Sequence, residues 1–169
     1  SRNPDAVAFG RDFNPEEART SRWIAEPFRL FDCSRENDGA GAILLVSTRL
    51  MSARQLAAMP CPVINLHAGI NPNYRGQMGG YWSLRENDPE NFGATLHLVD
   101  AGTDTGGTLY EVRTRPTSAD FISTYPLLLT IASLDITRRS LEDALAGRLA
   151  PHTPDGPSAL RFPPTLWSW

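Results

Sequence analysis

Residues 62–76, PVINLHAGINPNYRG, join a short apolar run to a polar loop rich in turn-forming residues. The run PVINL predicts a buried strand, because it is short, apolar and bounded by turn signals. Asn65 and His67 stand two positions apart, so strand alternation places both side chains on one side of the backbone. Open α/β sheets bind ligands at the ends of such strands. The stretch therefore predicts an α/β fold with a polar site, although turn capping alone would also explain Asn-x-His.

Apolar runs on both sides of this stretch suggest how the rest of the chain is organised. Strands are predicted at 5–9, 28–33, 42–47, 62–66, 94–99 and 108–116. Helices are predicted at 14–27, at 53–59 after an N-cap at Ser52, through Trp82 to about Pro89, and over 117–149 with a division at Pro126. This order favours an α/β, Rossmann-like layered fold with a mostly parallel central sheet. Little chain precedes Asp5, so we expect the first strand-helix unit to be lacking or modified.

The C-terminal residues differ in composition from the rest. Residues 1–150 are predicted to form one catalytic domain, and residues 151–169 a proline- and tryptophan-containing tail packed on that body or on a partner. A homodimer would be one way of covering this tail.

Composition argues against several classes of function. The chain has 169 residues, 41% of them hydrophobic, and a net charge of -3. This charge gives no basic footprint for nucleic acid, and the apolar runs are too short to cross a membrane. All 16 basic residues are arginine, which leaves no lysine for a Schiff base or a P-loop. Two unpatterned cysteines suit a reducing compartment and make no metal set. We therefore expect a cytoplasmic protein with no metal, no nucleic-acid partner and no membrane partner.

A second polar loop, DAGTDTGG at residues 100–107, follows the run ATLHLV. If the two strands are neighbours, both loops are expected at the same carboxyl edge of the sheet, where an Asn, a His and an Asp would meet. Asn can donate to a carbonyl oxygen, and His and Asp can move protons. No serine or cysteine stands beside them as a nucleophile. The trio therefore suits acyl transfer to an amine, or hydrolysis, without a covalent intermediate, while the aspartates read alone are ordinary turn residues.

Taken together, these motifs resemble the folate-dependent formyltransferase family, which includes the glycinamide ribonucleotide, methionyl-tRNA and amino-sugar N-formyltransferases. The resemblance covers roughly residues 42–113. It rests on Asn65 and His67, the loop Pro72 to Gly76, His97 with Val99, and the loop Asp100 to Gly106.

This resemblance implies a reaction within one-carbon metabolism. The chain would transfer a formyl group from 10-formyltetrahydrofolate, through a tetrahedral intermediate, to the amine of a small molecule such as an amino sugar or an amino acid. Asn65 would hold the formyl oxygen. His67, kept charged by Asp104, would stabilise the oxyanion. Asp104 would also help to move the proton of the amine.

The resemblance also implies binding residues. Arg49, Leu50 and Met51 would form one wall of the folate site, and Asp100, Ala101, Gly102 and Thr103 the other. Tyr74, Arg75 and Gly76 are candidates for contact with the acceptor, whereas His97 is expected to be a core or supporting residue.

Two alternatives accompany this interpretation. Water could replace the amine, which would make the chain a formyltetrahydrofolate hydrolase that releases formate. The chain could also be a noncatalytic remnant that binds folate or a partner. A glycine-rich phosphate loop is not evident in the first 40 residues, which argues against a ribonucleotide acceptor.

Overall fold

The computed structural model describes residues 41–121 and 123–165, together with the backbone of four short N-terminal strands. These strands are β1 (Val7–Ala8), β2 (Arg11–Asp12), β3 (Trp23–Ala25) and β4 (Phe28–Arg29), which pair as β1–β2 and β3–β4. β3 occupies part of the stretch predicted as a helix over 14–27, so that prediction is wrong at its C-terminal end. The rest of this helix, and the prediction about a first strand-helix unit, lie outside the described residues.

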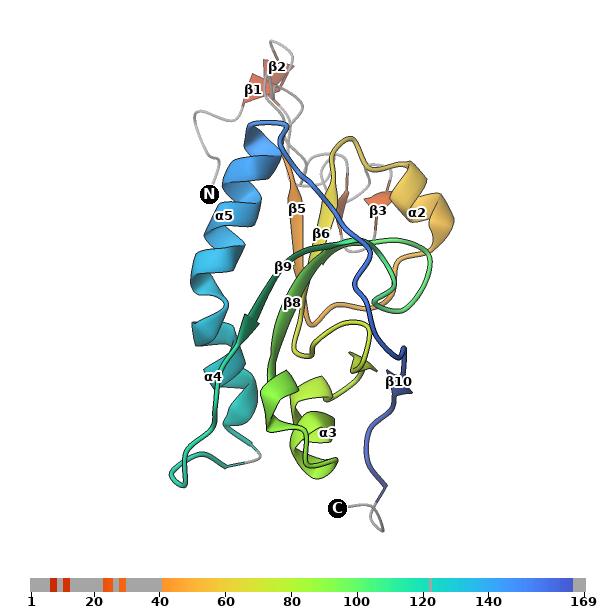
Figure 1. Cartoon of the computed structure of the whole chain (residues 1–169). Coiled ribbons are helices and arrows are strands. Elements are labelled where there is room, and N and C mark those ends of the chain that lie inside the picture. The colour runs from red at the N-terminus through yellow and green to blue at the C-terminus, as the bar shows by residue number, and fades with distance from the viewer. Residues whose placement is uncertain are drawn as a thin grey trace.

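A four-stranded sheet forms the centre of the described fold (Figure 1). Its order is β5 (Ile43–Val46), β6 (Val63–His67), β8 (Gly93–Leu98) and β9 (Thr108–Arg113). The helix α2 (Ala53–Ala57) connects β5 to β6, which run parallel. The strand β8 is antiparallel to both β6 and β9. The layered α/β class is thus confirmed, and three of the four strands, β5, β6 and β9, run in one direction, whereas β8 is reversed.

The antiparallel pairing of β8 with β9 has a local cause. The connection between β8 and β9, residues 99–107, is too short for a crossover helix, and strands joined by such loops pair antiparallel. The backbone N–H of Leu98 donates to the carbonyl of Gly107 at 2.9 Å, which closes this hairpin.

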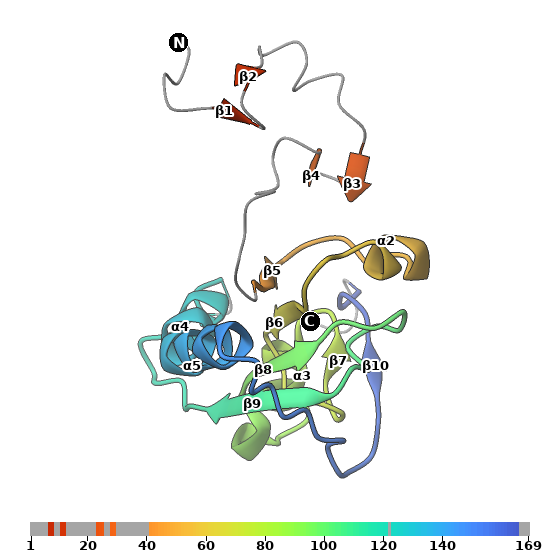
Figure 2. The ribbon, with the colours of Figure 1, turned by 90° about the horizontal axis from the view of Figure 1, so that it is seen from above.

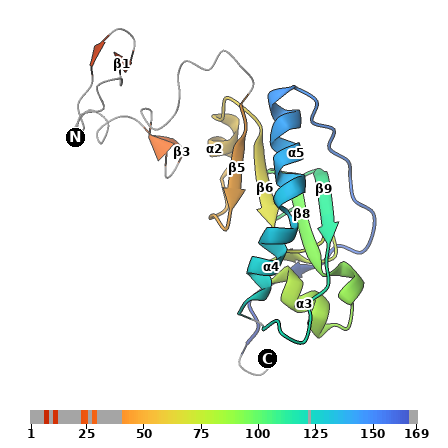
Figure 3. The same ribbon diagram turned by 90° about the vertical axis from the view of Figure 1, so that its left-hand side faces the viewer.

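Helices lie on both sides of the sheet. The helices α4 (Tyr125–Ala132) and α5 (Leu134–Leu145) lie on one side, and α2 lies on the other (Figure 2). The helix α3 (Gly79–Arg85) contacts α4 and is followed by the short η1 (Pro89–Asn91). From the side, β5 and α2 lie at one edge of the sheet and β9 at the other (Figure 3).

The long C-terminal helix divides at a different residue from the one predicted. Pro126 does not interrupt it, because Pro126 lies in the first turn of α4. Backbone N–H groups in a first turn have no acceptor within the helix, so a proline there removes no helical hydrogen bond. The division instead falls at Ser133, between α4 and α5. Residues 117–121 lie outside the helix, because Asp120 accepts hydrogen bonds from the N–H and hydroxyl of Thr117 and closes a turn there.

The predicted N-cap at Ser52 is confirmed. Its hydroxyl accepts from the backbone N–H of Gln55, and the Gln55 side chain accepts from the backbone N–H of Ser52 at 2.8 Å. This reciprocal capping box fixes the start of α2. It therefore also anchors the end of the segment 47–51, which comes before the helix.

The residues after α5 return across the molecule. The short strand β10 (Leu160–Arg161) pairs in parallel with β7 (Arg75–Gly76), and His152 forms an isolated bridge with Thr108. Among the described helices, none has the length and apolar character needed to cross a bilayer.

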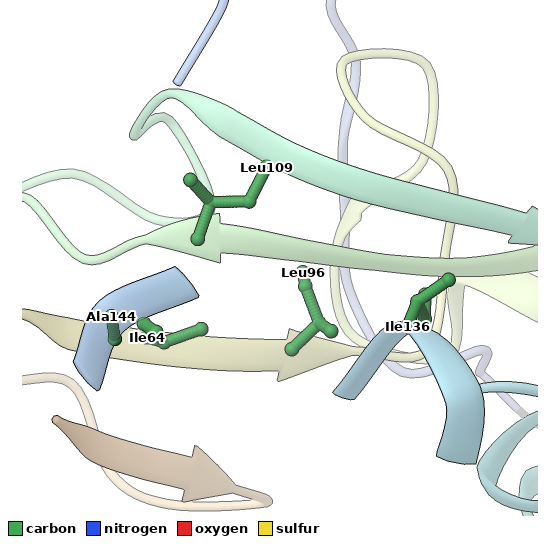
Figure 4. Packing of buried hydrophobic residues seen from close by; sticks show 5 residues of the cluster. All are labelled: Ile64, Leu96, Leu109, Ile136 and Ala144. Atoms are coloured by element: carbon green, nitrogen blue, oxygen red, sulfur yellow. The ribbon is translucent and has the colours of Figure 1, made fainter. Parts of the chain in front are cut away.

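One hydrophobic cluster joins the sheet to α5 (Figure 4). Its buried members are Ile64, Leu96, Leu109, Ile136 and Ala144. Ile64 and Leu96 pack from adjacent strands, with no side-chain surface exposed. This cluster holds β6 and β8, the two strands that carry the polar residues of the site.

Replacing Leu96 by Ala is expected to lower the free energy of unfolding by about 3 kcal/mol, because the cavity left in this cluster cannot collapse fully. Urea unfolding measures the change. The matched control is Leu127→Ala, since Leu127 is 62% exposed and its truncation should cost less than about 0.5 kcal/mol. Equal losses in the two variants would contradict this account of the core.

Candidate active site

The loop 99–107 brings the predicted trio together, although the two strands do not share a carboxyl edge. Asn65 on β6 pairs directly with His97 on the antiparallel β8. The loops that follow these two strands therefore leave the sheet at opposite ends, so the expectation of a common edge is wrong. The loop 99–107 nevertheless places Asp104, in a left-handed conformation with φ 50°, against both Asn65 and His67.

The amide nitrogen of Asn65 lies beside two polar atoms. It is 3.2 Å from Asp104 Oδ1, to which it donates, and 3.1 Å from His97 Nε2, and these two neighbours are 3.2 Å apart. The three atoms thus form a nearly equilateral triangle, in which the two neighbours subtend about 60° at a nitrogen whose two N–H bonds diverge by about 120°. Only one N–H can therefore point toward this pair, and the second is available for another partner.

His97 supports this arrangement from the neighbouring strand. Its Nδ1 lies 2.8 Å from the carbonyl oxygen of Leu98, which can only accept, so Nδ1 carries a proton. Its Nε2 lies between the amide nitrogen of Asn65, at 3.1 Å, and Asp104 Oδ1, at 3.2 Å. The resemblance implies that His97 is a core or supporting residue, and its pairing with Asn65 across the strands is what brings it to the site.

His67 is buried between a carbonyl and a carboxylate. Its Nε2 lies 2.7 Å from the carbonyl oxygen of Tyr74 and therefore donates to it, while Nδ1 lies 3.5 Å from Asp104 Oδ2. Burial lowers the pKa of His67 below its ordinary value, and this outweighs the opposite effects of Asp104 and the Tyr74 carbonyl. The expectation that Asp104 keeps His67 charged is thus wrong: the neutral ring presents a lone pair at Nδ1.

Asp104 is held in place by backbone as well as by side chains. Its Oδ2 accepts a hydrogen bond of 2.8 Å from the backbone N–H of Gly76. Burial acts to raise the pKa of Asp104, but the His97 ring, His67 and the Gly76 N–H together hold that pKa below its usual range. Asp104 is therefore an ionised carboxylate at neutral pH.

These shifts predict how stability depends on pH. The folded-state pKa of His67 lies below the ordinary value of 6.5, so the unfolded chain binds the extra proton first as the pH falls. The contribution of neutral His67 is complete above pH 6.5 and is lost as the pH falls through its folded-state pKa. Asp104 adds a loss of the same sign below its ordinary value of 3.8.

Urea unfolding between pH 8 and pH 5 measures this effect. The free energy of unfolding is expected to fall with acidification in the unmodified chain, by at most about 1.4 kcal/mol per pH unit for one proton. The fall should be smaller in His67→Gln and unchanged in His152→Gln, because His152 is exposed. A slope that His67→Gln leaves intact would contradict the assignment.

A cavity of about 730 Å³ opens over these residues. Asn65, His67, His97 and Asp104 all line it. One wall contains Arg49, Leu50 and Met51, and another contains Asp100, Gly102 and Thr103. Six of the seven residues predicted to bind folate therefore face one cavity, and Ala101 is not among its lining residues. From α4, Pro126 and Thr130 complete the lining.

Two of the three residues predicted to contact the acceptor, Tyr74 and Arg75, make contacts within the chain instead of lining the cavity. The hydroxyl of Tyr74 donates to Asp88 at 2.8 Å, and this buried ring does not line the cavity. The guanidinium of Arg75 donates to the carbonyl of Thr103 at 3.1 Å and so ties the two loops together. Of the three residues, only Gly76 lines the cavity.

Comparison with known proteins gives a match to one family model and relatives of more than one named activity. The model of the formyl transferase family matches residues 34–125. A methionyl-tRNA formyltransferase of Sorangium cellulosum (strain So ce56) is 31% identical over 153 residues, which cover 86% of this chain and 44% of that protein. A 17-hydroxy-3-oxo-4-pregnene-20-carboxyl-CoA lyase of Mycobacterium tuberculosis (strain ATCC 25618 / H37Rv) is 38% identical over 85 residues, which cover 46% of this chain and 22% of that protein. The chain thus spans less than half the length of either relative.

A solved structure shows the same fold. The formyltransferase PseJ from Anoxybacillus kamchatkensis, in complex with UDP-4,6-dideoxy-4-formamido-L-AltNAc and tetrahydrofolate, superposes with a TM-score of 0.63. Its sequence is 18% identical, and the alignment covers 76% of this chain and 69% of that one.

Proposed function

We propose a catalytic function for this chain, which belongs to the formyl transferase family. The reaction is transfer of a formyl group from 10-formyltetrahydrofolate to the amine of a small molecule. The observation that supports it most directly is the meeting of Asn65, His67 and Asp104 at one cavity, with a free amide N–H and a free imidazole lone pair.

The cavity walls fit a folate. Leu50 and Met51 offer apolar surface to a flat ring system, and Leu50 is 73% exposed, so its side chain is available for contact. Arg49, on the same wall, is a cation that suits the carboxylates of a folate. When bound, the folate supplies the formyl group on its N10 nitrogen.

Asn65 acts on the carbonyl. As the amine attacks, negative charge develops on the formyl oxygen, and a fixed N–H donor stabilises that charge. The second N–H of Asn65 is suited to this task, because the first donates to Asp104 and the contact with His97 on the same side holds the amide plane. His97 thereby positions Asn65 without touching the formyl group.

His67 transfers the proton of the amine, and Asp104 stabilises the charge that His67 gains. A bond forms between the amine nitrogen and the formyl carbon, and His67 accepts the proton of the amine at Nδ1. Asp104, 3.5 Å away, stabilises the resulting imidazolium. The bond from the formyl carbon to N10 then breaks, and His67 returns the proton to N10, so that atoms and charge balance.

The acceptor is proposed to be an amino sugar or an amino acid. The bound molecule named for PseJ is a formamido sugar nucleotide, which supports the first class through likeness of fold. Gly76, Gln77 and Thr130 line the cavity and offer polar contacts for hydroxyl groups.

Turnover of 10-formyltetrahydrofolate carrying a ¹³C-labelled formyl group tests the function. The chain is incubated with this donor, with and without a panel of amino sugars and amino acids, and NMR follows the label. The label is expected in a formamide only when an amine is present. Labelled formate without any amine would identify a hydrolase, and saturable folate binding without turnover on any amine would identify a binding protein. Either result would overturn the proposed transfer.

A further inference from the structure

The C-terminal segment 159–162 lies behind the loop that holds the site. We propose that Arg161 in this segment is a positioning residue, which fixes Asp104 and His67 through the backbone of residues 74–76. For its kinetic consequence, this inference rests on the proposed formyl transfer. Its structural readout needs no substrate.

Residues 74–76 supply three contacts to the site. The carbonyl of Tyr74 accepts the proton on His67 Nε2 at 2.7 Å. The Arg75 side chain donates to the carbonyl of Thr103 at 3.1 Å, and the Gly76 N–H donates to Asp104 at 2.8 Å. The position of this short backbone segment therefore sets the positions of His67 and Asp104 relative to each other.

The opposite side of the same backbone is held by the C-terminal segment. The N–H of Arg75 donates to the carbonyl of Ala159 at 3.1 Å, and the N–H of Gln77 donates to the carbonyl of Arg161 at 2.9 Å. Gly76 has φ +90°, and a Cβ atom at this position would overlap the Arg161 carbonyl oxygen. The two segments are thus in such close approach that only glycine fits.

The Arg161 side chain anchors this segment to the body. Its guanidinium carbon lies 5.7 Å from the centre of the Tyr74 ring and 5.8 Å from that of the Trp82 ring. Its Nη2 donates to Glu86 at 2.7 Å. The Trp82 indole N–H donates to the carbonyl of Phe162 at 2.9 Å. A cation placed near two aromatic rings and paired with a carboxylate gives a specific attachment to α3.

Loss of this attachment is expected to release β10 from β7. The Gly76 N–H would then leave Asp104 for part of the time, and one of the groups that hold down the pKa of this carboxylate would be weakened. The geometry of the trio would change although Arg161 does not line the cavity.

Amide hydrogen exchange of the whole chain tests this proposal. In Arg161→Gln, exchange at the Gly76 amide is expected to accelerate by about 30-fold or more, whereas the core amide of Leu96 changes by less than about 3-fold, because opening is local. Arg161→Lys, which keeps the cation, should recover part of the protection. Arg138→Gln is the control, since Arg138 pairs with Glu142 on an exposed face of α5.

Kinetics give the second readout. In Arg161→Gln, kcat for formyl transfer should fall about 10-fold with an unchanged KM for the donor, because geometry and not binding is affected. Unchanged exchange at Gly76, or equal acceleration at Gly76 and Leu96, would overturn the positioning role. Absence of transfer by the unmodified chain would instead overturn the proposed function and leave the exchange result as the test of Arg161.

Discussion

Asp104→Asn is expected to lower kcat for formyl transfer by about 10³-fold, while the chain stays folded. The amide keeps the shape of the side chain and one oxygen for the Gly76 N–H, but it removes the negative charge. It also places an NH2 group where Asn65 and His97 contact Oδ1, so a donor would face the Asn65 donor. Both the stabilisation of an imidazolium at His67 and the orientation of Asn65 would be lost.

Steady-state kinetics and folate binding together measure this effect. The Kd for the donor should change little, because the loss occurs mainly in the transition state. Asp135→Asn is the matched control, since Asp135 is exposed in the first turn of α5 and its replacement removes the same formal charge. Full activity in Asp104→Asn, or an equal loss in Asp135→Asn, would contradict the role of Asp104.

Removal of the His67 ring is expected to have a comparable or larger effect. In His67→Ala, kcat should fall by about 10³-fold or more, because neither a base nor an imidazolium remains. His67→Ala also leaves the buried carbonyl of Tyr74 without its donor, which costs about 1–3 kcal/mol of stability. His67→Gln separates these two effects, since its amide N–H can donate to Tyr74 but offers no base.

Kinetics and urea unfolding on both variants give the comparison. His67→Gln should retain more stability than His67→Ala and yet be similarly inactive. His152→Ala is the control, because His152 is exposed and its bridge to Thr108 uses backbone atoms. If His67→Gln transfers formyl groups at the unmodified rate, the ring has no part in the chemistry.

Local patterns were sufficient to predict much of this site. The spacing of Asn65 and His67 predicted that both lie on one side of a strand, and both contact Asp104 as anticipated from its loop. The capping box at Ser52 follows from its immediate neighbours. These features depend on a few adjacent residues. The resemblance to a family, and not the spacing, supplied the expectation that these residues act together in formyl transfer.

Features that depend on distant packing were not predictable in this way. The antiparallel pairing of β8 with β6 was not predictable, because apolar periodicity does not distinguish parallel from antiparallel neighbours. The lowered pKa of His67 depends on burial by surrounding elements, which opposes the nearby carboxylate. Arg161 pairs with Gly76 across 85 positions of the chain, and no local sequence pattern indicates this pairing.

The central claim is that Asn65 donates a hydrogen bond to the formyl oxygen of a bound folate. Isotope-edited infrared spectroscopy of 10-formyltetrahydrofolate with a ¹³C-labelled formyl carbonyl, bound without amine, tests it directly. The account predicts that the carbonyl stretch of the bound donor lies at lower frequency than that of the free donor, and that Asn65→Ala returns it toward the free value. A bound frequency equal to the free one, or a shift that persists unchanged in Asn65→Ala, would contradict the account.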